Sequence, residues 1–136
     1  MTKARDIMTK NVEVIREDET IAVAAKRLAQ NDVGAMPICD GDRLRGMLTD
    51  RDIVVKVIAE GRDPQQVTAR ELETGNPVTI GADDPIEEAL STMAQHKVRR
   101  LPVIDGHSLV GMVSQAYVVK ALPKERAGEL VAIISQ

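Results

Sequence analysis

The sequence of 136 residues is almost free of aromatic side chains, since Tyr117 is its one aromatic residue and both phenylalanine and tryptophan are absent. The core must therefore be built from aliphatic side chains, and a bound base would have to lie between aliphatic groups. The net charge of −3 gives no general attraction to anionic polymers or membranes. Because the sequence offers neither a stacking platform nor a basic stripe, nucleic acid is disfavoured as a partner.

Cysteine and long apolar runs are scarce as well. Cys39 is the single cysteine, which excludes an internal disulfide and is typical of a reducing cytoplasm. No apolar run approaches the roughly 18 residues that a membrane-spanning helix needs. The N-terminus contains no apolar signal segment. We therefore expect a cytoplasmic protein without a membrane segment.

Signatures of catalysis and of metal binding are missing too. The sequence contains neither a Walker motif nor a GxGxxG motif, and no nucleophile, base and acid form a recognisable set. His96 and His107 have no cysteine or carboxylate at ligand spacing. We predict that the protein is not an enzyme, that it has no catalytic residues and no metal site, and that it requires no cofactor.

An internal repeat dominates the sequence. Shifting the chain by 65 residues aligns 4–56 with 69–121 without a gap, and eighteen of the 53 aligned positions are identical. The identical pairs include Asn11/Asn76, Pro37/Pro102, Asp40/Asp105, Gly41/Gly106, Gly46/Gly111 and Met47/Met112. Cys39 aligns with Ile104, which favours a small buried hydrophobic side chain over a redox switch at this position.

Each copy is predicted to be a β-α-β-β-α unit, so the fold class is α/β (α+β). The strands are expected at Val12–Ile15, Met36–Cys39 and Leu44–Leu48, and again at Pro77–Ile80, Leu101–Ile104 and Leu109–Val113. An Asp-Gly turn joins the last two strands of each copy into a hairpin.

Two helices are expected in each copy. Apolar residues at helical spacing predict the first helix over 21–28 and its counterpart over 86–93. The counterpart is expected to begin with Asp84 as N-cap, Pro85 as first helical residue and Glu87 as capping carboxylate. The last helix should present one apolar face and stop at Gly61 in the first copy and at Pro123 in the second. In the first copy the residues of this face are Ile53, Val54, Val57 and Ile58.

The repeat also predicts the domain organisation. The first copy is assigned to 1–62 and the second to 63–122, with a linker around 61–64 and a C-terminal tail over 123–136 that contains the apolar run Leu130–Ile134. About 60 residues are marginal for an independent core. We therefore expect the sheets of the two copies to pack together and to leave two related clefts between them, where a ligand would bind.

The hairpins and the last helices show a resemblance to a known family. Each copy has an apolar-Pro-apolar strand, 36–38 and 101–103, and a Gly-x-x-[Ser/Thr] step into its last helix, 46–49 and 111–114. In these features the chain resembles a pair of CBS domains, also called a Bateman module, over about residues 4–122. The CBS domain takes its name from cystathionine β-synthase. The segment 46–53 is similar to that of small stand-alone bacterial CBS proteins, including the hypoxic-response type. The resemblance implies a regulatory protein and a homodimer formed through the helices.

The resemblance also implies a ligand, because the usual ligands of the family are adenosine nucleotides and sometimes S-adenosylmethionine. In ligand-binding members a Thr/Ser-x-x-Asp step directs its carboxylate to the ribose, and basic residues before the proline of the other copy bind the phosphate. By position, this assigns Thr49 and Asp52 to the ribose and Arg99 and Arg100 to the phosphate. AMP, ADP and ATP are the candidate ligands. The remaining candidate contacts are Arg51, Val12, Met36, Pro37 and Pro102.

The chemistry of these side chains agrees with that assignment. One carboxylate can accept both hydrogen bonds of a vicinal diol, and a guanidinium group gives a phosphate charge-assisted, bidentate hydrogen bonds. The helix that begins near Thr49 adds free N–H groups and the positive end of its dipole.

The two copies differ at the residues that matter for such a ligand. Tyr117 stands where the first copy has Asp52, and Gly34 and Ala35 stand where the second copy has its two arginines. If a site takes its acid from one copy and its arginines from the other, one cleft has both and the other has neither. We therefore expect one working site and one inactive site, the latter filled by Tyr117.

Each of these signals also has a structural explanation. Thr49-x-x-Asp52 is a capping box, which needs no ligand. Arg99 and Arg100 fit a solvated strand end, and Arg51 and Lys56 fit exposed helix positions. At the level of sequence both explanations stay open.

Two functions follow from the sequence. The first is a nucleotide-responsive regulatory module that signals through its conformation or its dimerisation to a separate effector protein. The alternative is a ligand-free dimeric stress-response protein that docks on another macromolecule. The retained Thr49, Asp52 and arginine pair favour the first function.

Overall fold

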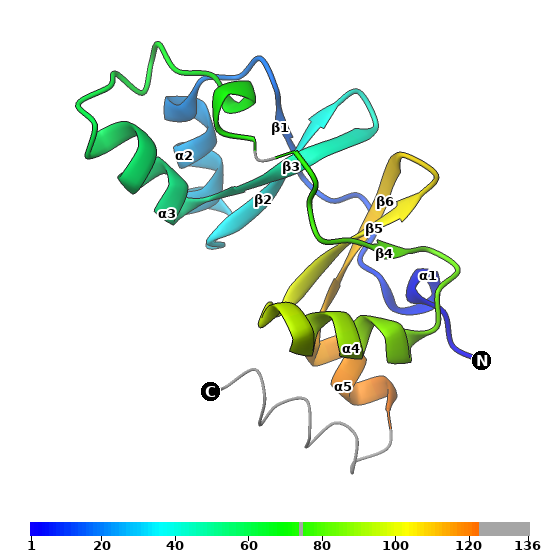
Figure 1. Cartoon of the computed structure of the whole chain (residues 1–136). Helices are drawn as coiled ribbons and strands as arrows, with labels where there is room; N and C mark the ends of the chain where they lie inside the picture. The colour runs from blue at the N-terminus through cyan, green and yellow to red at the C-terminus, as the bar shows by residue number, and fades with distance from the viewer. Residues whose placement is uncertain (74, 123–136) are drawn as a thin grey trace. The chain divides into compact units, whose positions relative to one another are not determined.

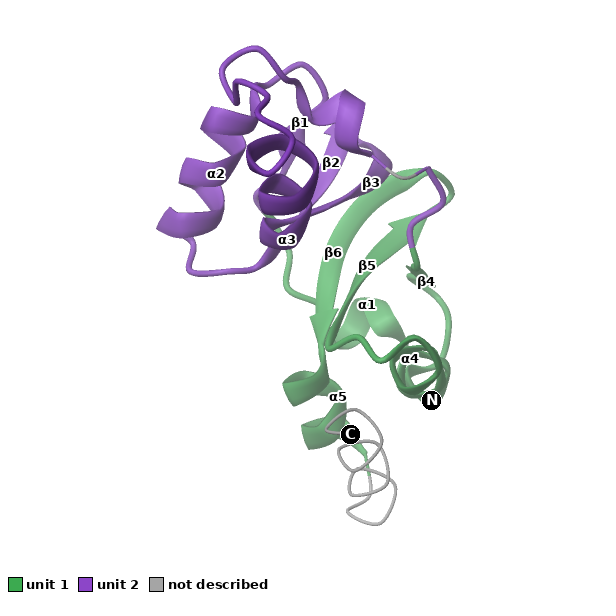
Figure 2. Ribbon diagram, turned by 60° about the vertical axis from the view of Figure 1, so that its left-hand side comes forward, with its two compact units in different colours: residues 1–12, 78–136 green, residues 13–77 purple. Residues whose placement is uncertain are grey.

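The computed structural model describes residues 1–73 and 75–122, and the chain divides into two compact units (Figures 1 and 2). Unit 1 consists of residues 1–12 and 78–136, and unit 2 consists of residues 13–77. The predicted tail over 123–136, with its apolar run Leu130–Ile134 and the helix stop at Pro123, lies outside the described residues.

Unit 2 contains a three-stranded sheet and the helices that follow from the first copy of the repeat. Its elements are β1 (Ile15–Arg16), α2 (Ile21–Gln30), β2 (Ala35–Asp40), β3 (Arg43–Thr49), α3 (Asp50–Ile53), a π-helical turn η1 (Val54–Ile58) and a 3₁₀ turn η2 (Ala69–Leu72). Strand β1 pairs with β2 in parallel, and β2 pairs with β3 antiparallel. This is the order that the repeat predicts, with a hairpin turn at Gly41, whose φ of 61° is easily adopted by glycine.

The core of unit 2 is aliphatic, as the lack of aromatic residues requires. Figure 2 shows α2 and α3 on one side of the sheet, and their inward side chains meet those of the strands. The fully buried side chains of this core include Ile15, Ile21, Ile38, Leu48 and Val57. Thr20 caps α2, since its hydroxyl accepts a hydrogen bond from the N–H group of Val23 at 3.3 Å.

Unit 1 repeats this arrangement with the second copy. Its elements are α1 (Ala4–Ile7), β4 (Ile80–Gly81), α4 (Ile86–His96), β5 (Arg100–Asp105), β6 (Ser108–Ser114) and α5 (Gln115–Ala121). Strand β4 pairs with β5 in parallel, and β5 pairs with β6 antiparallel. Buried aliphatic side chains again form the core, among them Ile86, Met93, Leu101, Val103, Val113 and Val118.

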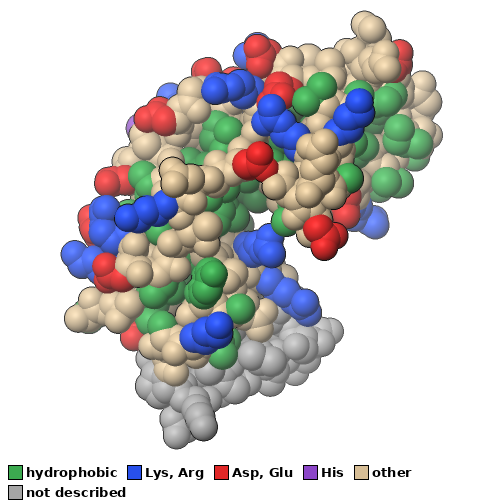
Figure 3. Space-filling view, turned by 180° about the vertical axis from the view of Figure 1, so that it is seen from behind, with side chains coloured by type: hydrophobic (Ala, Val, Ile, Leu, Met, Phe, Trp, Pro, Cys, Tyr) green, Lys and Arg blue, Asp and Glu red, His purple; other side chains and the backbone are tan. Residues whose placement is uncertain are grey.

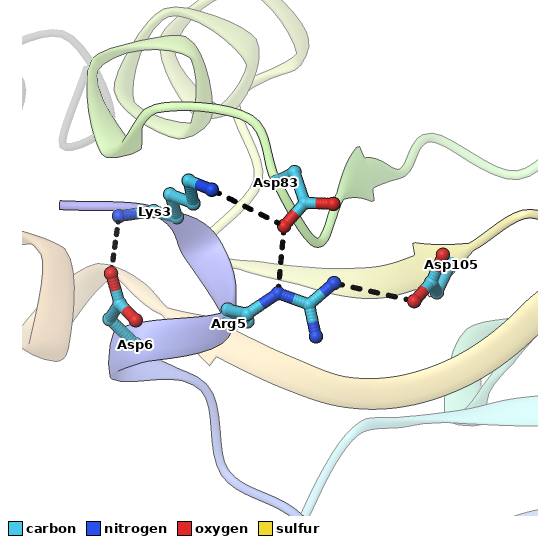
Figure 4. A network of polar contacts seen from close by, with 5 residues as sticks. All are labelled: Lys3, Arg5, Asp6, Asp83 and Asp105. Carbon is cyan, nitrogen blue, oxygen red and sulfur yellow. Dashed lines mark hydrogen bonds and ion pairs between the residues drawn. The ribbon is translucent and has the colours of Figure 1, made fainter. Parts of the chain in front are cut away.

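The first residues of the chain belong to unit 1, although in sequence they begin the first copy of the repeat. The N–H groups of Ala4 and Arg5 donate to the carbonyls of Asp84 and Ala82, each at 2.9 Å. The Arg5 side chain then holds two carboxylates, with Nε 2.8 Å from Asp83 and Nη2 3.3 Å from Asp105 (Figure 4). These contacts attach the N-terminal segment to the loop before α4.

The equivalent segment of the second copy completes unit 2 in the same way. The N–H group of Ile21 donates to the Val67 carbonyl at 2.8 Å, and that of Ala69 donates to the Glu19 carbonyl at 2.9 Å. Val67, Ala69 and Leu72 are buried in the core of unit 2. The first segment of each copy therefore accepts hydrogen bonds from free N–H groups at the start of the other copy's first helix, which helix ends require.

Two predicted strands are shorter than the sequence suggests. Pairing begins only at Ile15 and at Ile80, whereas strands were expected from Val12 and from Pro77. In the first copy the carbonyl of Val14 accepts a hydrogen bond from the Arg27 side chain instead of a neighbouring strand. In the second copy Pro77 has no N–H group to donate to a strand.

The predicted N-cap of α4 is wrong. The carboxylate of Asp84 accepts a hydrogen bond from the Gly81 N–H group at 2.8 Å, so it closes the preceding turn. Pro85 occupies the cap position without a side-chain hydrogen bond, and the helix begins one residue later, at Ile86. The N–H group of Ile86 donates to the Thr2 carbonyl at 3.1 Å, so the N-terminal segment does part of what a capping side chain would do.

The single apolar face predicted for the last helix of unit 2 is also corrected. Ile53 and Val57 are buried, but Val54 and Ile58 are 58% and 55% exposed. The N–H group of Ala59 donates to the Val54 carbonyl, five residues back, because this turn is π-helical. A π-helical turn is wider than the 3.6-residue period on which the prediction rests, so the apolar positions no longer share one face.

The predicted fold class is confirmed, because both units are α+β and carry the two copies of the repeat. The packing of the two sheets against each other stays a prediction, and so do the domain boundaries at 62/63 and 122/123. Among the described residues, no helix has the length and the apolar character that crossing a bilayer requires.

Candidate functional site

The Thr49-x-x-Asp52 motif forms the junction between β3 and α3. The Thr49 hydroxyl accepts a hydrogen bond from the Asp52 N–H group at 3.0 Å, and the Asp52 carboxylate accepts one from the Thr49 N–H group at 3.2 Å. The two residues thus form a reciprocal capping box. The structural explanation of the motif is therefore correct, and it fixes the Asp52 carboxylate at the start of the helix.

The Asp52 carboxylate retains capacity for a further partner. Its Oδ2 atom faces the Thr49 N–H group, and its Oδ1 atom lies 3.4 Å from the Lys56 ammonium group, one turn along the helix. Its side chain is 22% exposed. Because each carboxylate oxygen has two acceptor positions, a hydroxyl group can still bind here beside Lys56.

The other candidate residues of unit 2 differ in their access to solvent. Met36 and Pro37 lie buried on β2, opposite Leu48 and Met47 of β3, so both contribute to the sheet and its packing. Arg51 is exposed on α3, as the structural explanation expects.

Four candidate residues lie in unit 1. Arg99 and Arg100 are exposed where the chain enters β5, and the carbonyl of Arg99 accepts a hydrogen bond from the Gln115 N–H group at 2.7 Å. Within the described part of the chain, neither guanidinium group forms an ion pair with a carboxylate. Pro102 is buried on β5, and Val12 is half-buried at the end of the N-terminal segment. The arginine pair therefore has its charges available for an anion.

The second copy keeps half of the capping box. The Ser114 hydroxyl accepts a hydrogen bond from the Tyr117 N–H group at 3.3 Å, but the position of the acid is taken by the tyrosine ring. That ring is 48% exposed, and the Lys120 ammonium group lies 6.0 Å from its centre. The second copy therefore has no carboxylate at the capping position. The filling of a cleft by Tyr117 stays a prediction.

The structure divides the candidate residues between the units. Unit 2 brings together Thr49, Asp52, Arg51, Met36 and Pro37, all on β2, β3 or α3. Unit 1 holds the arginine pair, together with Pro102 and Val12. The meeting of the carboxylate half with the guanidinium half stays a prediction.

One charged cluster in unit 2 was not anticipated from the sequence. Glu17 is 5% exposed and lies 3.4 Å from both Arg45 and Arg70, while Glu73 lies 3.9 Å from Arg45. One oxygen of each glutamate is buried without a hydrogen-bond partner among the described residues. The repeat contains a signal for this cluster, because three of its four residues align with apolar residues of the other copy. Those apolar residues are Ala82, Val110 and Met8, which align with Glu17, Arg45 and Glu73.

The single cysteine is buried, as predicted. Cys39 is 2% exposed on β2, and burial raises the pKa of its thiol to about 11. The thiolate is therefore rare at neutral pH, and the residue packs as a small hydrophobe.

Neither a metal cluster nor a basic stripe stands out in the described part of the chain. No group of three or more histidine, cysteine, aspartate or glutamate side chains among these residues could hold a metal ion. On the face drawn in Figure 3, basic side chains lie among acidic ones rather than in a continuous band.

Comparison with known proteins identifies the repeat. The family model of the CBS domain matches twice, over residues 4–59 and 69–124. Hypoxic response protein 1 of Mycobacterium tuberculosis is 47% identical over 135 residues, which cover 98% of this chain and 94% of that protein. The CBS domain-containing protein YhcV of Bacillus subtilis is 39% identical over 140 residues, which cover 99% and 96% of the two chains.

Solved structures agree with this relationship. A crystal structure of Hypoxic Response Protein I with two coordinated zinc ions matches 90% of this chain and 100% of that chain at a TM-score of 0.81 and 49% identity. The structure of CBSX2 in complex with AMP matches 89% and 96% of the two chains at a TM-score of 0.75 and 25% identity. With two family matches and full-length relatives of this similarity, the chain belongs to the CBS domain family, as a tandem pair of CBS domains similar to the hypoxic-response type.

Proposed function

We propose that this CBS pair is a regulatory protein that binds one adenosine nucleotide per chain. Asp52 accepts the hydrogen bonds of the ribose hydroxyls, and Arg99 and Arg100 bind the phosphate. The observation that carries the proposal is the division of these groups: the acid occurs only in the first copy and the arginine pair only in the second. The AMP complex of CBSX2, a relative of the same fold, supports adenosine nucleotides as the ligand class.

The geometry of the capping box supports Asp52 as the ribose acceptor. The box orients the carboxylate without using up its acceptor positions. The exposed arginine pair supplies the charge-assisted hydrogen bonds that a phosphate needs. The ligand would signal by stabilising one conformation of the pair, or one state of association, over another.

The proposal is tested by titration calorimetry with AMP, ADP and ATP. Asp52→Asn keeps the acceptor for the Thr49 N–H group but removes the charge, so we expect affinity to fall about tenfold to a hundredfold. Arg99→Gln with Arg100→Gln should weaken binding at least as much. Asp50→Asn and Arg43→Gln, which change exposed residues outside the assigned site, serve as matched controls.

Stoichiometry provides a separate criterion. One nucleotide per chain is expected, because only one combination of the copies offers both the acid and the arginines. Two equivalent sites per chain, or an Asp52→Asn variant that binds AMP as tightly as the parent, would show that the assignment is wrong.

The alternative function is a ligand-free dimeric interaction protein of a stress response. It is favoured by three exposed aliphatic side chains in five residues of η1, namely Val54, Val55 and Ile58. It predicts that no adenosine compound raises the melting temperature. A ligand at 100 times its Kd should stabilise the chain by about 2.7 kcal/mol, which a thermal-shift panel would detect.

We also propose that the chain needs no metal. The Hypoxic Response Protein I structure with its two zinc ions makes this worth testing directly. Zn²⁺ belongs in the same thermal-shift panel, with EDTA-treated protein as the reference. A clear stabilisation by Zn²⁺ alone would contradict the proposal.

A further inference from the structure

Lys56 lies against the carboxylate that is assigned to the ribose. Its ammonium group is 3.4 Å from the Oδ1 atom of Asp52, and the side chains of Lys56 and Asp52 are 44% and 22% exposed. The other carboxylate oxygen, Oδ2, accepts the hydrogen bond from the Thr49 N–H group at 3.2 Å. The capping box therefore holds the carboxylate, and Oδ1 is the oxygen that a ligand would share with Lys56.

The contact between Lys56 and Asp52 is looser than a charge-assisted hydrogen bond. Such bonds join nitrogen and oxygen at about 2.7–2.9 Å, whereas the two groups are 3.4 Å apart. An ammonium group has three N–H donors. Across residues 1–73 and 75–122, Lys56 forms no second ion pair. It therefore has donors left for a ligand that binds Asp52.

A ribose hydroxyl can bind both groups at once, because it donates one hydrogen bond and has two acceptor positions. If the hydroxyl donates to Oδ1 of Asp52 at about 2.7 Å, its oxygen comes within reach of an ammonium group that lies 3.4 Å from the same Oδ1 atom. A carboxylate alone recognises a hydroxyl only as a donor, whereas the pair recognises it as donor and acceptor. A ligand that lacks this hydroxyl leaves both charges without their partner.

The internal repeat keeps or loses these two residues together. In the second copy Tyr117 stands in place of Asp52, and Ala121 stands in place of Lys56. An ion pair four residues apart also supports a helix, but α5 of the second copy forms without either charge. The copy that keeps the acid thus keeps the ammonium group beside it, although the helix does not require the pair.

We infer that Lys56 is a second ribose-binding residue, which together with Asp52 makes the site selective for a ribonucleotide over its deoxy counterparts. The inference rests on the proposed nucleotide site and deepens it, because it names the part of the ligand that the site discriminates. It also gives a role to a lysine that the sequence alone places among the exposed helix charges.

Titration calorimetry of the full chain with AMP, 2′-deoxy-AMP and 3′-deoxy-AMP tests this inference. We expect the parent to bind at least one deoxy analogue about tenfold more weakly than AMP. Lys56→Ala, which introduces the residue of the second copy, should weaken AMP by about tenfold and that analogue much less, so that the selectivity collapses. Lys56→Arg keeps a charged donor and should retain most of the selectivity.

Lys26→Ala is the matched control, because Lys26 is an exposed lysine on α2 and its loss changes the net charge equally. This variant should bind all three nucleotides like the parent. Adenosine separates a ribose contact from a phosphate contact, since it has the same ribose and no phosphate. Lys56→Ala should therefore weaken adenosine by the same factor as AMP.

Three results overturn the inference. An unchanged ratio of deoxy to ribose affinity in Lys56→Ala would mean that the ammonium group does not contact a ribose hydroxyl. Tighter binding of AMP by this variant would mean that Lys56 competes with the ribose for Asp52. A loss of affinity for AMP with none for adenosine would mean that Lys56 binds the phosphate instead.

The Asp52→Asn variant distinguishes this inference from the proposed function. A parent that binds AMP, with an Asp52→Asn variant that binds it more weakly, supports the nucleotide site whatever Lys56 does. Unchanged selectivity in Lys56→Ala then overturns the ribose pair alone. A parent chain that binds neither AMP nor adenosine overturns both.

Discussion

Glu17 and Glu73 form the least expected residue pair of the chain, because two carboxylates share a buried site with Arg45 and Arg70. Burial, together with the hydrogen bond and the charge of Glu17, raises the pKa of Glu73. Burial alone would raise the pKa of Glu17 too, but its hydrogen bond with Glu73 and the charges of both arginines outweigh it, and the pKa is lowered. From these opposite directions we expect Glu73 to keep its proton to higher pH and to share it with Glu17.

The sign of the resulting pH dependence follows from linkage. An acid whose pKa is raised on folding stabilises the folded state below its unfolded pKa, 4.5 for Glu73, and this contribution is lost as the pH rises through the folded pKa. Glu73→Gln supplies a permanent hydrogen-bond donor to Glu17. We expect this variant to lose less stability than the parent as the pH rises from 4.5 to 8, as measured by thermal unfolding across that range.

Glu71→Gln is the control of opposite sign. The Thr68 backbone N–H group and the Arg62 side chain lower the pKa of Glu71, so its contribution is present at neutral pH and lost on acidification. This variant should be less stable than the parent at pH 7 and match it at low pH. Parallel pH profiles for the parent and Glu73→Gln would contradict the shared proton.

At the scale of single elements, periodicity predicted most of the structure. Helix α2 and both hairpins lie where apolar spacing and the Asp-Gly turns put them. The errors occur in irregular backbone, where hydrogen bonds outside the regular pattern determine the structure. Val14 is not paired in a strand, and its carbonyl accepts a hydrogen bond from the Arg27 side chain. The turn η1 is π-helical although its residues show an ordinary helical pattern. These local structures depend on tertiary contacts, and the spacing of apolar residues along the sequence carries no information about those contacts.

The contact between the N-terminal segment and β6 makes an element-scale prediction at Gly111. A Cβ atom at this position would lie 2.6 Å from the Met8 sulfur and 2.8 Å from the Thr9 carbonyl oxygen. Thr9 is held there by two hydrogen bonds with Met112, of 2.8 and 3.0 Å, so the backbone must shift. We expect Gly111→Ala to destabilise the chain by about 1–3 kcal/mol in urea unfolding.

Gly34→Ala is the matched control for this substitution. The added Cβ atom would lie 3.4 Å from the Asp50 carboxylate, a contact that needs little adjustment, and Gly34 has no positive φ. Its cost should therefore be within about 0.5 kcal/mol, as for most exposed positions. Equal costs for the two alanine variants would mean that the N-terminal segment does not pack tightly on β6.

For the whole molecule, the repeat predicted two similar units but not how the chain divides between them. The predicted first copy spans residues 1–62, whereas the compact unit that holds most of this copy spans 13–77 and leaves residues 1–12 to the other unit. The candidate site does not depend on this division: the resemblance to CBS domains assigned the acid and the arginines, the alignment of the copies showed that each occurs in one copy only, and their role stays a prediction. The buried Glu17 cluster was missed because Glu73 comes from the segment that joins unit 2 from the second copy.

The first segment of each copy packs in the unit formed mainly by the other copy, and this arrangement predicts which fragment of the chain folds by itself. A fragment of residues 13–77 retains Val67 and Leu72 in its core, whereas one of residues 1–62 loses both, together with the carbonyl that accepts the Ile21 N–H group. Burial of side chains of this size stabilises by about 1.5–3 kcal/mol each, a large share of the stability of so small a unit. We expect a cooperative thermal transition by circular dichroism for 13–77 and none for 1–62. Since the two fragments have nearly the same length, a cooperative transition in 1–62 of equal midpoint would mean that the first segment of the second copy does not complete the core of unit 2.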